Sequence, residues 1–414
     1  MSLLGPKEAP IEAPVSLVLV GIGGMGGVYV RELLLRESEG LFRIAGAVDP
    51  QPNRCEQYKE LRALGVPCFV GLADFYRNKK AELAVLSSPI QFHREQTCLA
   101  LERGSHVLCE KPAAATIQEV REMMAAEKGS GRWAAVGYQW SYSRAVQALK
   151  SDIRAGLFGR AKRMKCLYLW PRDEGYYARN DWAGKKRVAG GSGWVLDSPA
   201  QNAMAHDLHN MFYVLGGETG RSAAPAGVEA ELYRAYPVEN FDTAAARVVT
   251  EDGVEILFYV THVAEGERGP VFRYEFEKAV VRCESRASGI WAELEDGSRK
   301  DYGVPDAEPM TKLWRSIAGV RDGSRPLCGV EAAAGQTLCV NGMQDSTPEI
   351  RDFPEGAVRA IVAADGTRRL AVDGLGEALE ACYEAGALPS EIGAAWSAKG
   401  KKIDLRSYAS FPSE

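Results

Sequence analysis

The sequence has no excess of positive charge and no long apolar run. Its 414 residues include 50 lysines and arginines against 55 aspartates and glutamates, which gives a formal net charge of −5 at pH 7. Nucleic acids are held by basic surfaces, so this balance argues against a nucleic-acid partner. No stretch approaches the ~20 apolar residues that span a bilayer, so we expect no membrane-embedded segment.

Paired cysteines are also missing. The nine cysteines are scattered between Cys55 and Cys382, their number is odd, and none forms a CxxC pair. Disulfide frameworks and zinc sites use such pairs, so we expect a reducing, cytoplasmic compartment, inert thiols and no metal site. Residues 1–14 contain no basic stretch followed by an apolar one, so we expect a flexible tail and not a signal peptide.

The first third of the chain alternates apolar strands with helical segments. Residues 15–20 form a continuous apolar run, which is typical of a buried parallel strand. Residues 42–49 and 81–89 predict two further strands, and residues 93–104 predict a helix. Because 414 residues exceed what one core accommodates, we predict a doubly wound, parallel α/β domain over residues 15–141 and at least one more domain.

The pattern changes after residue 141. Longer strand candidates, separated by turn signals, occupy residues 163–170, 227–238, 244–263 and 272–285. Helices are predicted at 144–156, 310–323, 329–344 and 376–386, and a hairpin is predicted at 357–372. We therefore predict that residues 142–414 form an α+β domain with a large, mostly antiparallel open sheet.

A glycine-rich turn follows the first strand. Gly21, Gly23 and Gly26 match G-x-G-x-x-G between a strand and a helix. In this context the glycines permit a tight turn, close approach of a pyrophosphate, and close packing of the helix, whose first N–H groups face the phosphates. Asp49 lies 23 residues beyond Gly26, where a carboxylate binds ribose hydroxyls and repels a 2′-phosphate. The alternative is a glycine turn without a ligand, but the spacing to Asp49 favours a bound dinucleotide. The carboxylate of Asp49 favours NAD over NADP.

Three further features lie between residues 87 and 114. A strand ends in Ser88-Pro89, a helix opens at His93, and "GSHVLCEKP" occupies residues 104–112. Together with the glycine turn, they resemble the Gfo/Idh/MocA family of sugar and polyol oxidoreductases, which includes glucose–fructose oxidoreductase and inositol 2-dehydrogenase. The resemblance covers residues 15–215 well and the later sheet loosely. It implies an N-terminal Rossmann domain that binds NAD, and hydride transfer to or from a secondary hydroxyl of a sugar, polyol or derivative.

The resemblance implies that Lys111 lies beside the nicotinamide and that Glu110 positions it. The chemistry supports this role apart from the resemblance. A carbinol releases hydride only as its hydroxyl loses a proton, so the negative charge that develops on the oxygen needs a hydrogen-bond donor. A desolvated lysine beside a cationic ring has a lowered pKa, which suits acid–base work. The resemblance also implies that His206 accepts the hydroxyl proton, a role that suits imidazole because its ordinary pKa is ~6.5. Lys111 and His206 are therefore the predicted catalytic residues.

Asn202, His206 and His209 follow one another at i, i+4 and i+7, so they would share one face of a helix. The family pattern D-x-G-x-H-x-x-D, counted back from Gly216, sets His206 on its histidine. Asn202 and His209 then replace its two aspartates, which predicts an altered substrate geometry with the hydride chemistry kept. The alternatives are core histidines or a metal-binding pair, although no further ligand accompanies the pair.

Residues 170–193 are rich in aromatic and cationic side chains, which suits stacking on a sugar and binding of an anion. A solvated loop is the alternative. The cations that could bind a carboxylate or phosphate are Arg172, Arg179, Lys185 and Arg187. The predicted substrate contacts are Lys111, Arg179, Trp182, Asn202, His206 and His209.

The predicted cofactor contacts are Gly21, Gly23, Gly24, Met25, Gly26, Asp49, Ser88, Pro89, His93, Glu110, Lys111 and Gln139. The family resemblance also implies a homodimer or homotetramer formed through the C-terminal sheet. Two other functions remain open at this point. Some relatives retain NAD and cleave glycosidic bonds by transient oxidation, and a dinucleotide site can also serve a non-catalytic regulatory protein.

Overall fold

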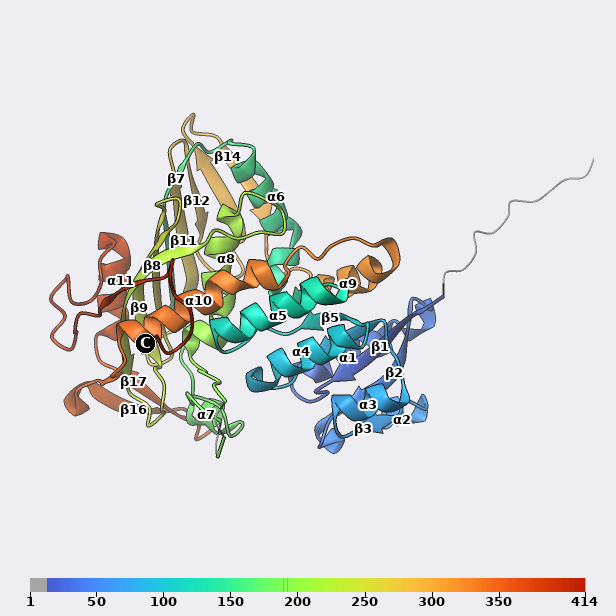
Figure 1. The fold of residues 1–414 in the computed structure, drawn as a ribbon. Coiled ribbons are helices and arrows are strands. Elements are labelled where there is room, and N and C mark those ends of the chain that lie inside the picture. Colours follow the sequence, from blue (N-terminus) through green and yellow to red (C-terminus); the bar gives the residue numbers. More distant parts are fainter. Residues whose placement is uncertain (1–12, 189, 192, 414) are drawn as a thin grey trace, which may run out of the picture.

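The computed structural model of the protein describes residues 13–188, 190–191 and 193–413. The expected flexible tail, residues 1–14, therefore lies outside the described residues except for its last two. The chain forms a six-stranded sheet, a ten-stranded sheet and a separate two-stranded hairpin. Figure 1 shows the two large sheets beside each other, with helices α5 and α10 running between them. No helix of the described part is long and apolar enough to cross a membrane.

The six-stranded sheet is parallel and has the order β3-β2-β1-β4-β5-β6. Its strands are β1 Val15–Val20, β2 Phe42–Val48, β3 Cys68–Phe69, β4 Leu83–Leu86, β5 His106–Cys109 and β6 Ala134–Val136. Its helices are α1 Met25–Leu35, α2 Tyr58–Ala63, α3 Leu72–Asn78, α4 His93–Glu102 and α5 Ile117–Ser130. Helices cover both faces, because α1 shares one apolar core with β1 while α4 and α5 share another. This confirms the predicted doubly wound domain.

A helix from late in the chain completes one face of this first sheet. Helix α9, Thr311–Asp322, packs on the same side as α1 through Leu313 and Ile317. A hydrogen bond also joins α9 to α1, from Trp314 Nε1 to Glu32 Oε1 at 2.7 Å. The division of the chain at residue 141 stays a prediction, and the structure adds that residues 311–322 belong to the first layer.

The ten-stranded sheet has the order β14-β13-β12-β11-β7-β10-β9-β8-β15, with β18 also pairing with β8. Its pairs are antiparallel except β7 with β10 and β8 with β15, among the described strands. Its strands are β7 Ala161–Leu169, β8 Pro225–Arg234, β9 Thr243–Thr250, β10 Glu255–Thr261, β11 Arg268–Phe276, β12 Ala279–Cys283, β13 Ile290–Leu294, β14 Arg299–Gly303, β15 Arg351–Asp352 and β18 Lys402–Asp404. The predicted large, mostly antiparallel sheet is confirmed.

Side chains alternate across this sheet, so each face carries its own core. On β7, Cys166 and Tyr168 join the core with α8 Ala205–Leu215 and α10 Val330–Ser346. Leu167 and Leu169 point the other way and pack with helix α11, Leu375–Ala385. The centre of the sheet is therefore covered on both faces by the chain itself.

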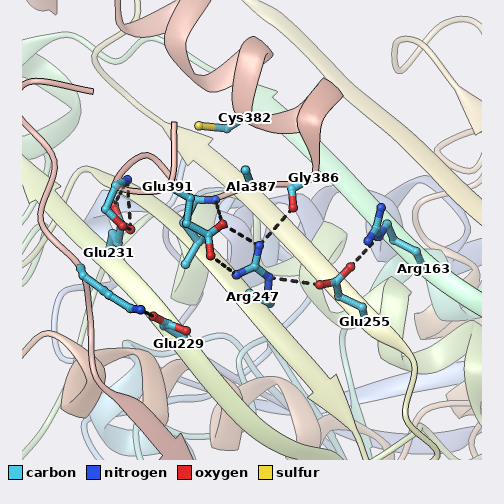
Figure 2. Close-up of polar contacts among 12 residues, drawn as sticks. Arg163, Glu229, Glu231, Arg247, Glu255, Cys382, Gly386, Ala387 and Glu391 are labelled. Carbon is cyan, nitrogen blue, oxygen red and sulfur yellow. Dashed lines mark hydrogen bonds and ion pairs between the residues drawn. The ribbon is translucent and has the colours of Figure 1, made fainter. Parts of the chain in front are cut away.

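The segment after α11 is fastened to the outer face of the sheet by an ion-pair network. Arg247 on β9 contacts both carboxylate oxygens of Glu391 at 2.6 and 2.7 Å and donates to Gly386 O at 3.1 Å. Its Nε also lies 3.1 Å from Glu255, which pairs with Arg163 at 2.5 Å. Figure 2 shows Arg247 at the centre of this chain of contacts.

The remaining elements are one longer helix, α6, and several short segments. They are α6 Arg144–Arg154, α7 Glu174–Ala178, the hairpin strands β16 Val358–Val362 and β17 Arg368–Val372, the 3-10 turns Glu37–Glu39, Pro52–Arg54, Ile90–Phe92, Gln139–Tyr142 and Glu355–Ala357, and one π-helical turn, Pro199–Ala203.

Candidate active site

The glycine turn closes tightly beneath an open surface. Gly21 has φ +72, and a Cβ on Gly26 would lie 1.7 Å from Gly21 O, so a side chain at position 26 would collide with backbone. A Cβ on Gly23 or Gly24 would meet nothing within 4 Å. Helix α1 begins at Met25, and the N–H groups of Gly26 and Gly27 donate to Gly23 O and Gly24 O within the turn. The turn has the shape that a dinucleotide pyrophosphate requires.

Asp49 is connected to this turn. Its Oδ2 accepts a hydrogen bond from Ile22 N at 2.9 Å, and its Oδ1 accepts one from Gln51 N at 2.7 Å. Each carboxylate oxygen can accept a further bond, so the group is still able to bind ribose hydroxyls. The carboxylate thus joins the ends of β1 and β2 at the place where a ribose would follow the pyrophosphate.

His93 connects the loops that follow β4 and β5. Its Nδ1 lies 2.8 Å from Pro112 O and its Nε2 lies 2.9 Å from Ser88 O. The ring is buried, and burial lowers its pKa. Both nitrogens are therefore used inside the protein. His93 holds Ser88, Pro89 and the Lys111–Pro112 segment in place.

Lys111 follows β5 and reaches across to the second layer. Its Nζ donates to Asn202 O at 2.7 Å and to Asn202 Oδ1 at 2.8 Å. Burial lowers the pKa of Lys111 to about 8, against the opposing charge of Glu110. An ammonium group has three donors, so one remains for a substrate oxygen.

Glu110 is buried between two partners that sequence reasoning did not identify. It accepts a hydrogen bond from the Tyr29 hydroxyl at 2.6 Å and forms an ion pair with Lys312 of α9. Burial alone would raise the pKa of Glu110, but the charge of Lys312 and its hydrogen bond leave it lowered. A signal was present in the sequence, because Lys312 lies on the apolar stripe of its helix, beside Leu313.

His206 is the second residue of α8. Its Nδ1 is buried without a hydrogen-bond partner among the described residues, which leaves Nε2 as the nitrogen that can reach a ligand. Burial, followed by the charge of Lys111, holds the pKa of His206 well below its ordinary range. The imidazole is therefore neutral at pH 7.

A cavity of about 360 Å³ joins these residues. It is lined by Lys111, Gln139, Trp170, Arg172, Tyr176, Arg179, Asn202, Ala203, His206 and Arg286. The structure thus brings together the predicted Lys111, Gln139, Arg179, Asn202 and His206. Trp170, Tyr176, Ala203 and Arg286 were not identified from the sequence. Trp182 does not line the cavity; it packs against a small core that includes Ile90 and Val195.

Asn202 and His206 line the cavity, but His209, an expected substrate contact, does not. A π-helical turn ends at Ala203, and Met204, with φ −112 and ψ 20, separates it from α8. This break lies between Asn202 and His206. His206 and His209 belong to the same unbroken helix, and both of their rings contact Tyr138. His209 is buried, stacks on Tyr138 at 3.9 Å, and has Nε2 3.0 Å from Ser141 Oγ. Burial lowers its pKa to about 3.

Asp197 stands behind Asn202 and was not among the predicted contacts. Its Oδ1 accepts a hydrogen bond from Asn202 Nδ2 at 2.8 Å, and its Oδ2 accepts one from Gly184 N at 2.7 Å. Arg179 lies 3.6 Å from the same Oδ2. Burial raises the pKa of Asp197, and Arg179 opposes this. Asp197 therefore orients Asn202, which in turn orients Lys111.

Asp306 fixes the opposite side of the cavity. Its Oδ1 accepts hydrogen bonds from Gln139 Nε2 at 2.7 Å and Trp140 Nε1 at 2.8 Å, and its Oδ2 lies 3.1 Å from Arg286. Gln139 and Arg286 come from distant parts of the chain, so this contact joins the two layers at the cavity. Within the described residues, no three His, Cys, Asp or Glu side chains are grouped to hold a metal ion.

Family models match most of the chain. One, described as the oxidoreductase family with an NAD-binding Rossmann fold, matches residues 15–138. Another, the GFO/IDH/MocA C-terminal domain, matches residues 146–282. The two matches together span well over half of the sequence.

Several characterised proteins are similar in sequence. The chain is 32% identical over 142 residues to 1,5-anhydro-D-fructose reductase of Ensifer adhaerens, covering 34% of this chain and 39% of that protein. It is 35% identical over 155 residues to D-glucoside 3-dehydrogenase of Escherichia coli, covering 37% and 43%. Each of these matches spans less than half of the relative. Inositol 2-dehydrogenase of Rubrobacter xylanophilus is 29% identical over 299 residues, covering 68% and 77%.

Solved structures share the fold. WlbA dehydrogenase from Bordetella pertussis, in complex with NADH and UDP-GlcNAcA, has a TM-score of 0.66 at 20% identity and covers 81% of this chain and 97% of that chain. Levoglucosan dehydrogenase in complex with NADH has a TM-score of 0.67 at 17% identity, with the same coverage. At these identities the likeness establishes the fold alone. With both domain models matched and the predicted two-sheet architecture observed, the chain belongs to the Gfo/Idh/MocA family of oxidoreductases with an NAD-binding Rossmann fold.

Proposed function

We propose that the protein is an NAD-dependent oxidoreductase that transfers hydride between nicotinamide and a secondary hydroxyl of a sugar, polyol or derivative. The observation that carries this proposal is that Lys111 and His206 line one cavity, although they come from different layers of the fold. The printed names of relatives support it, since they include a sugar reductase, a glucoside dehydrogenase and an inositol dehydrogenase.

The glycine turn and Asp49 fit a bound dinucleotide. Residues 21–26 would hold the pyrophosphate, and Asp49 would bind the adenosine ribose. No cation stands directly after Asp49, where Pro50 and Gln51 follow, so a 2′-phosphate would meet only the carboxylate. This favours NAD over NADP. When bound, NAD supplies the hydride acceptor or donor.

The chain's own residues handle the proton. Lys111 uses two of its donors on Asn202, and its third stabilises negative charge on the reacting oxygen. His206 is neutral, so its Nε2 accepts the hydroxyl proton during oxidation and returns it during reduction. Arg179 and Asn202 face the same space and are proposed substrate contacts.

One experiment separates this proposal from its two alternatives. Purified protein is mixed with NAD and a panel of polyols, sugars, uronic acids and aryl glycosides, while NADH absorbance and aglycone release are followed together. NADH formation that is lost in Lys111→Ala establishes the dehydrogenase. Aglycone release without NADH establishes a glycosidase that retains its cofactor. NAD binding, measured by calorimetry, without either signal points to a regulatory protein.

Two further expectations concern the whole protein. We propose a cytoplasmic location, which the composition and the unpaired cysteines support. We also propose a homodimer or homotetramer formed through the C-terminal sheet. Helix α11 and residues 386–391 already pack on β7, β9 and β10, so this contact would use β11 to β14. Light scattering should give two or four times the chain mass of 45.0 kDa, whereas 45.0 kDa itself would reject self-association.

A further inference from the structure

The cavity has an excess of positive charge. Among the described residues that line it, the charged side chains are Lys111, Arg172, Arg179 and Arg286, and none is a carboxylate. Arg179 and Arg286 have acidic partners behind them, Asp197 at 3.6 Å and Asp306 at 3.1 Å. Lys111 is held by the oxygens of Asn202. Arg172 differs from these three residues because its guanidinium has no such oxygen partner among the described residues.

Arg172 has no counter-ion. No acidic group of the described chain lies within ion-pair distance of its guanidinium, and its buried Nε has no hydrogen-bond partner. Its guanidinium carbon lies 3.6 Å from the ring centroid of Trp170 and 4.7 Å from that of Tyr176. Arginine stays protonated in proteins, so this is a permanent, partly desolvated charge whose donors are unused.

The backbone of Arg172 is nevertheless firmly held. Its N–H donates to His262 O at 2.9 Å, and its carbonyl accepts a hydrogen bond from the Tyr236 hydroxyl at 2.6 Å. With the aromatic rings of Trp170 and Tyr176 against the guanidinium, the side chain is positioned before any ligand arrives. A positioned guanidinium without a partner is suited to bind a carboxylate or phosphate through two parallel hydrogen bonds.

We infer that the substrate carries an anionic group, a carboxylate or a phosphate, and that Arg172 binds it. The substrate class is then an acidic sugar or polyol derivative, with Lys111 at the reacting hydroxyl. This inference rests on the proposed function and narrows it. The hydroxyl groups of a neutral sugar could accept hydrogen bonds from Arg172, but they would leave its charge without a counter-ion.

The test compares matched probes that differ in one group. D-glucose, D-glucuronate and D-glucose 6-phosphate, and the pair D-galactose and D-galacturonate, are titrated calorimetrically into the protein–NADH complex. We expect the anionic members to bind more tightly than the neutral ones, with an affinity that falls as salt is raised. The uronates and the phosphate separate the two sources of negative charge.

Variants assign the effect to Arg172. Arg172→Gln should weaken binding of the anionic probes by about 10- to 100-fold and leave D-glucose within about twofold. Arg172→Lys keeps the charge but cannot form two parallel hydrogen bonds to one anionic group. Its affinity for the anionic probes should therefore lie between those of wild type and Arg172→Gln. The control is Arg36→Gln, which removes an arginine that stacks on Trp314 at 4.0 Å and does not line the cavity, so it should leave binding of the probes unchanged.

The outcomes distinguish this inference from the proposed function. Equal or tighter binding of the neutral probes, or anion binding unchanged in Arg172→Gln, overturns the inference. Turnover of neutral sugars that depends on Lys111 would then still support the proposed function. Anion binding that requires Arg172, together with no NADH formation from any probe, would support an anion site and reject the oxidoreductase. NADH binding without sugar should be the same in all variants.

Discussion

At the scale of single residues, the protonation of Lys111 depends on its neighbours. Glu110 and Asp197 favour the charged form of the ammonium, whereas burial, Lys312 and Arg179 disfavour it. The result is a pKa of about 8, close to the pH at which an acid–base group is most effective. Carbonyl reduction needs the charged lysine, so the rate of reduction should fall as pH rises through about 8.

Replacing Asp197 with asparagine should shift the pH at which the reduction rate falls. Removing a negative charge disfavours the ammonium, so the apparent pKa in the pH profile of kcat/KM should shift below its wild-type value. The measurement is the reduction rate between pH 6 and pH 10, followed by NADH consumption. Asp181→Asn, at an exposed position in the same segment, serves as the control. An apparent pKa that stays in place or moves upward would contradict the assignment to Lys111.

At the scale of elements, α9 is held against the first sheet by a buried ion pair. Lys312 and Glu110 are both buried and contact each other, and Tyr29 completes the cluster. Removing one partner of such a pair leaves an uncompensated buried charge, which commonly costs about 3–5 kcal/mol. Removing both charges together avoids that penalty.

Lys312→Met should therefore destabilise the protein more than the double variant Lys312→Met/Glu110→Gln does. We expect a loss of about 3 kcal/mol in the free energy of unfolding for the single variant and less than half of that for the double. Urea denaturation followed by tryptophan fluorescence measures both. If the double variant is as unstable as the single one or less stable, the ion pair does not set the position of α9.

A second ion-pair network joins the C-terminal segment to the outer face of the sheet (Figure 2). Hydrogen bonds from Arg247 lower the pKa of Glu391 to about 2. A carboxyl group whose folded-state pKa is lowered contributes stability that is fully present above its unfolded pKa of 4.5, and this contribution is lost as pH falls toward 2. Because about a third of Glu391 is exposed, solvent screening keeps the effect to about 1 kcal/mol.

Arg247→Gln should thus lower the urea midpoint at pH 7, and the difference from wild type should shrink as pH falls from 5 toward 2. The comparison uses denaturation curves of the two proteins at several pH values. Arg359→Gln, which removes an exposed ion pair of the β16–β17 hairpin, is the control. A difference that stays constant with pH would show that Arg247 acts through packing and not through Glu391.

The limits of sequence reasoning are visible in particular elements. The glycine turn, the strand before it and the EKP segment are local patterns, so their placement could be predicted. Arg286 and Lys312 reach the site from distant elements, and a lone cation in a sequence does not reveal its tertiary partner. His206 and His209 lie in one helix, as their spacing predicts, but periodicity does not reveal depth, so it could not show that His206 lines the cavity while His209 packs in the core against Tyr138.

At the scale of the whole molecule, the cavity forms where the part of the chain built on the six-stranded sheet meets the part built on the ten-stranded sheet. Lys111 follows the carboxyl end of β5, while Asn202 and His206 come from the segment at the start of α8. Asp306 joins Gln139 to Arg286. In Figure 1 the chain returns to the six-stranded sheet through α9, and α10 then runs between α5 and the ten-stranded sheet. Segments from late in the chain therefore fix the position of the glycine turn relative to the cationic cavity.

The most direct measurement is NADH formation at saturating NAD, with neutral and acidic sugars, in wild type and Lys111→Met. The account predicts NADH from at least one class of sugar, with a rate reduced by about 10²- to 10⁴-fold in the variant and with NAD affinity unchanged. If NAD binds but no sugar yields NADH, or if Lys111→Met is as fast as wild type, hydride transfer at this cavity is contradicted.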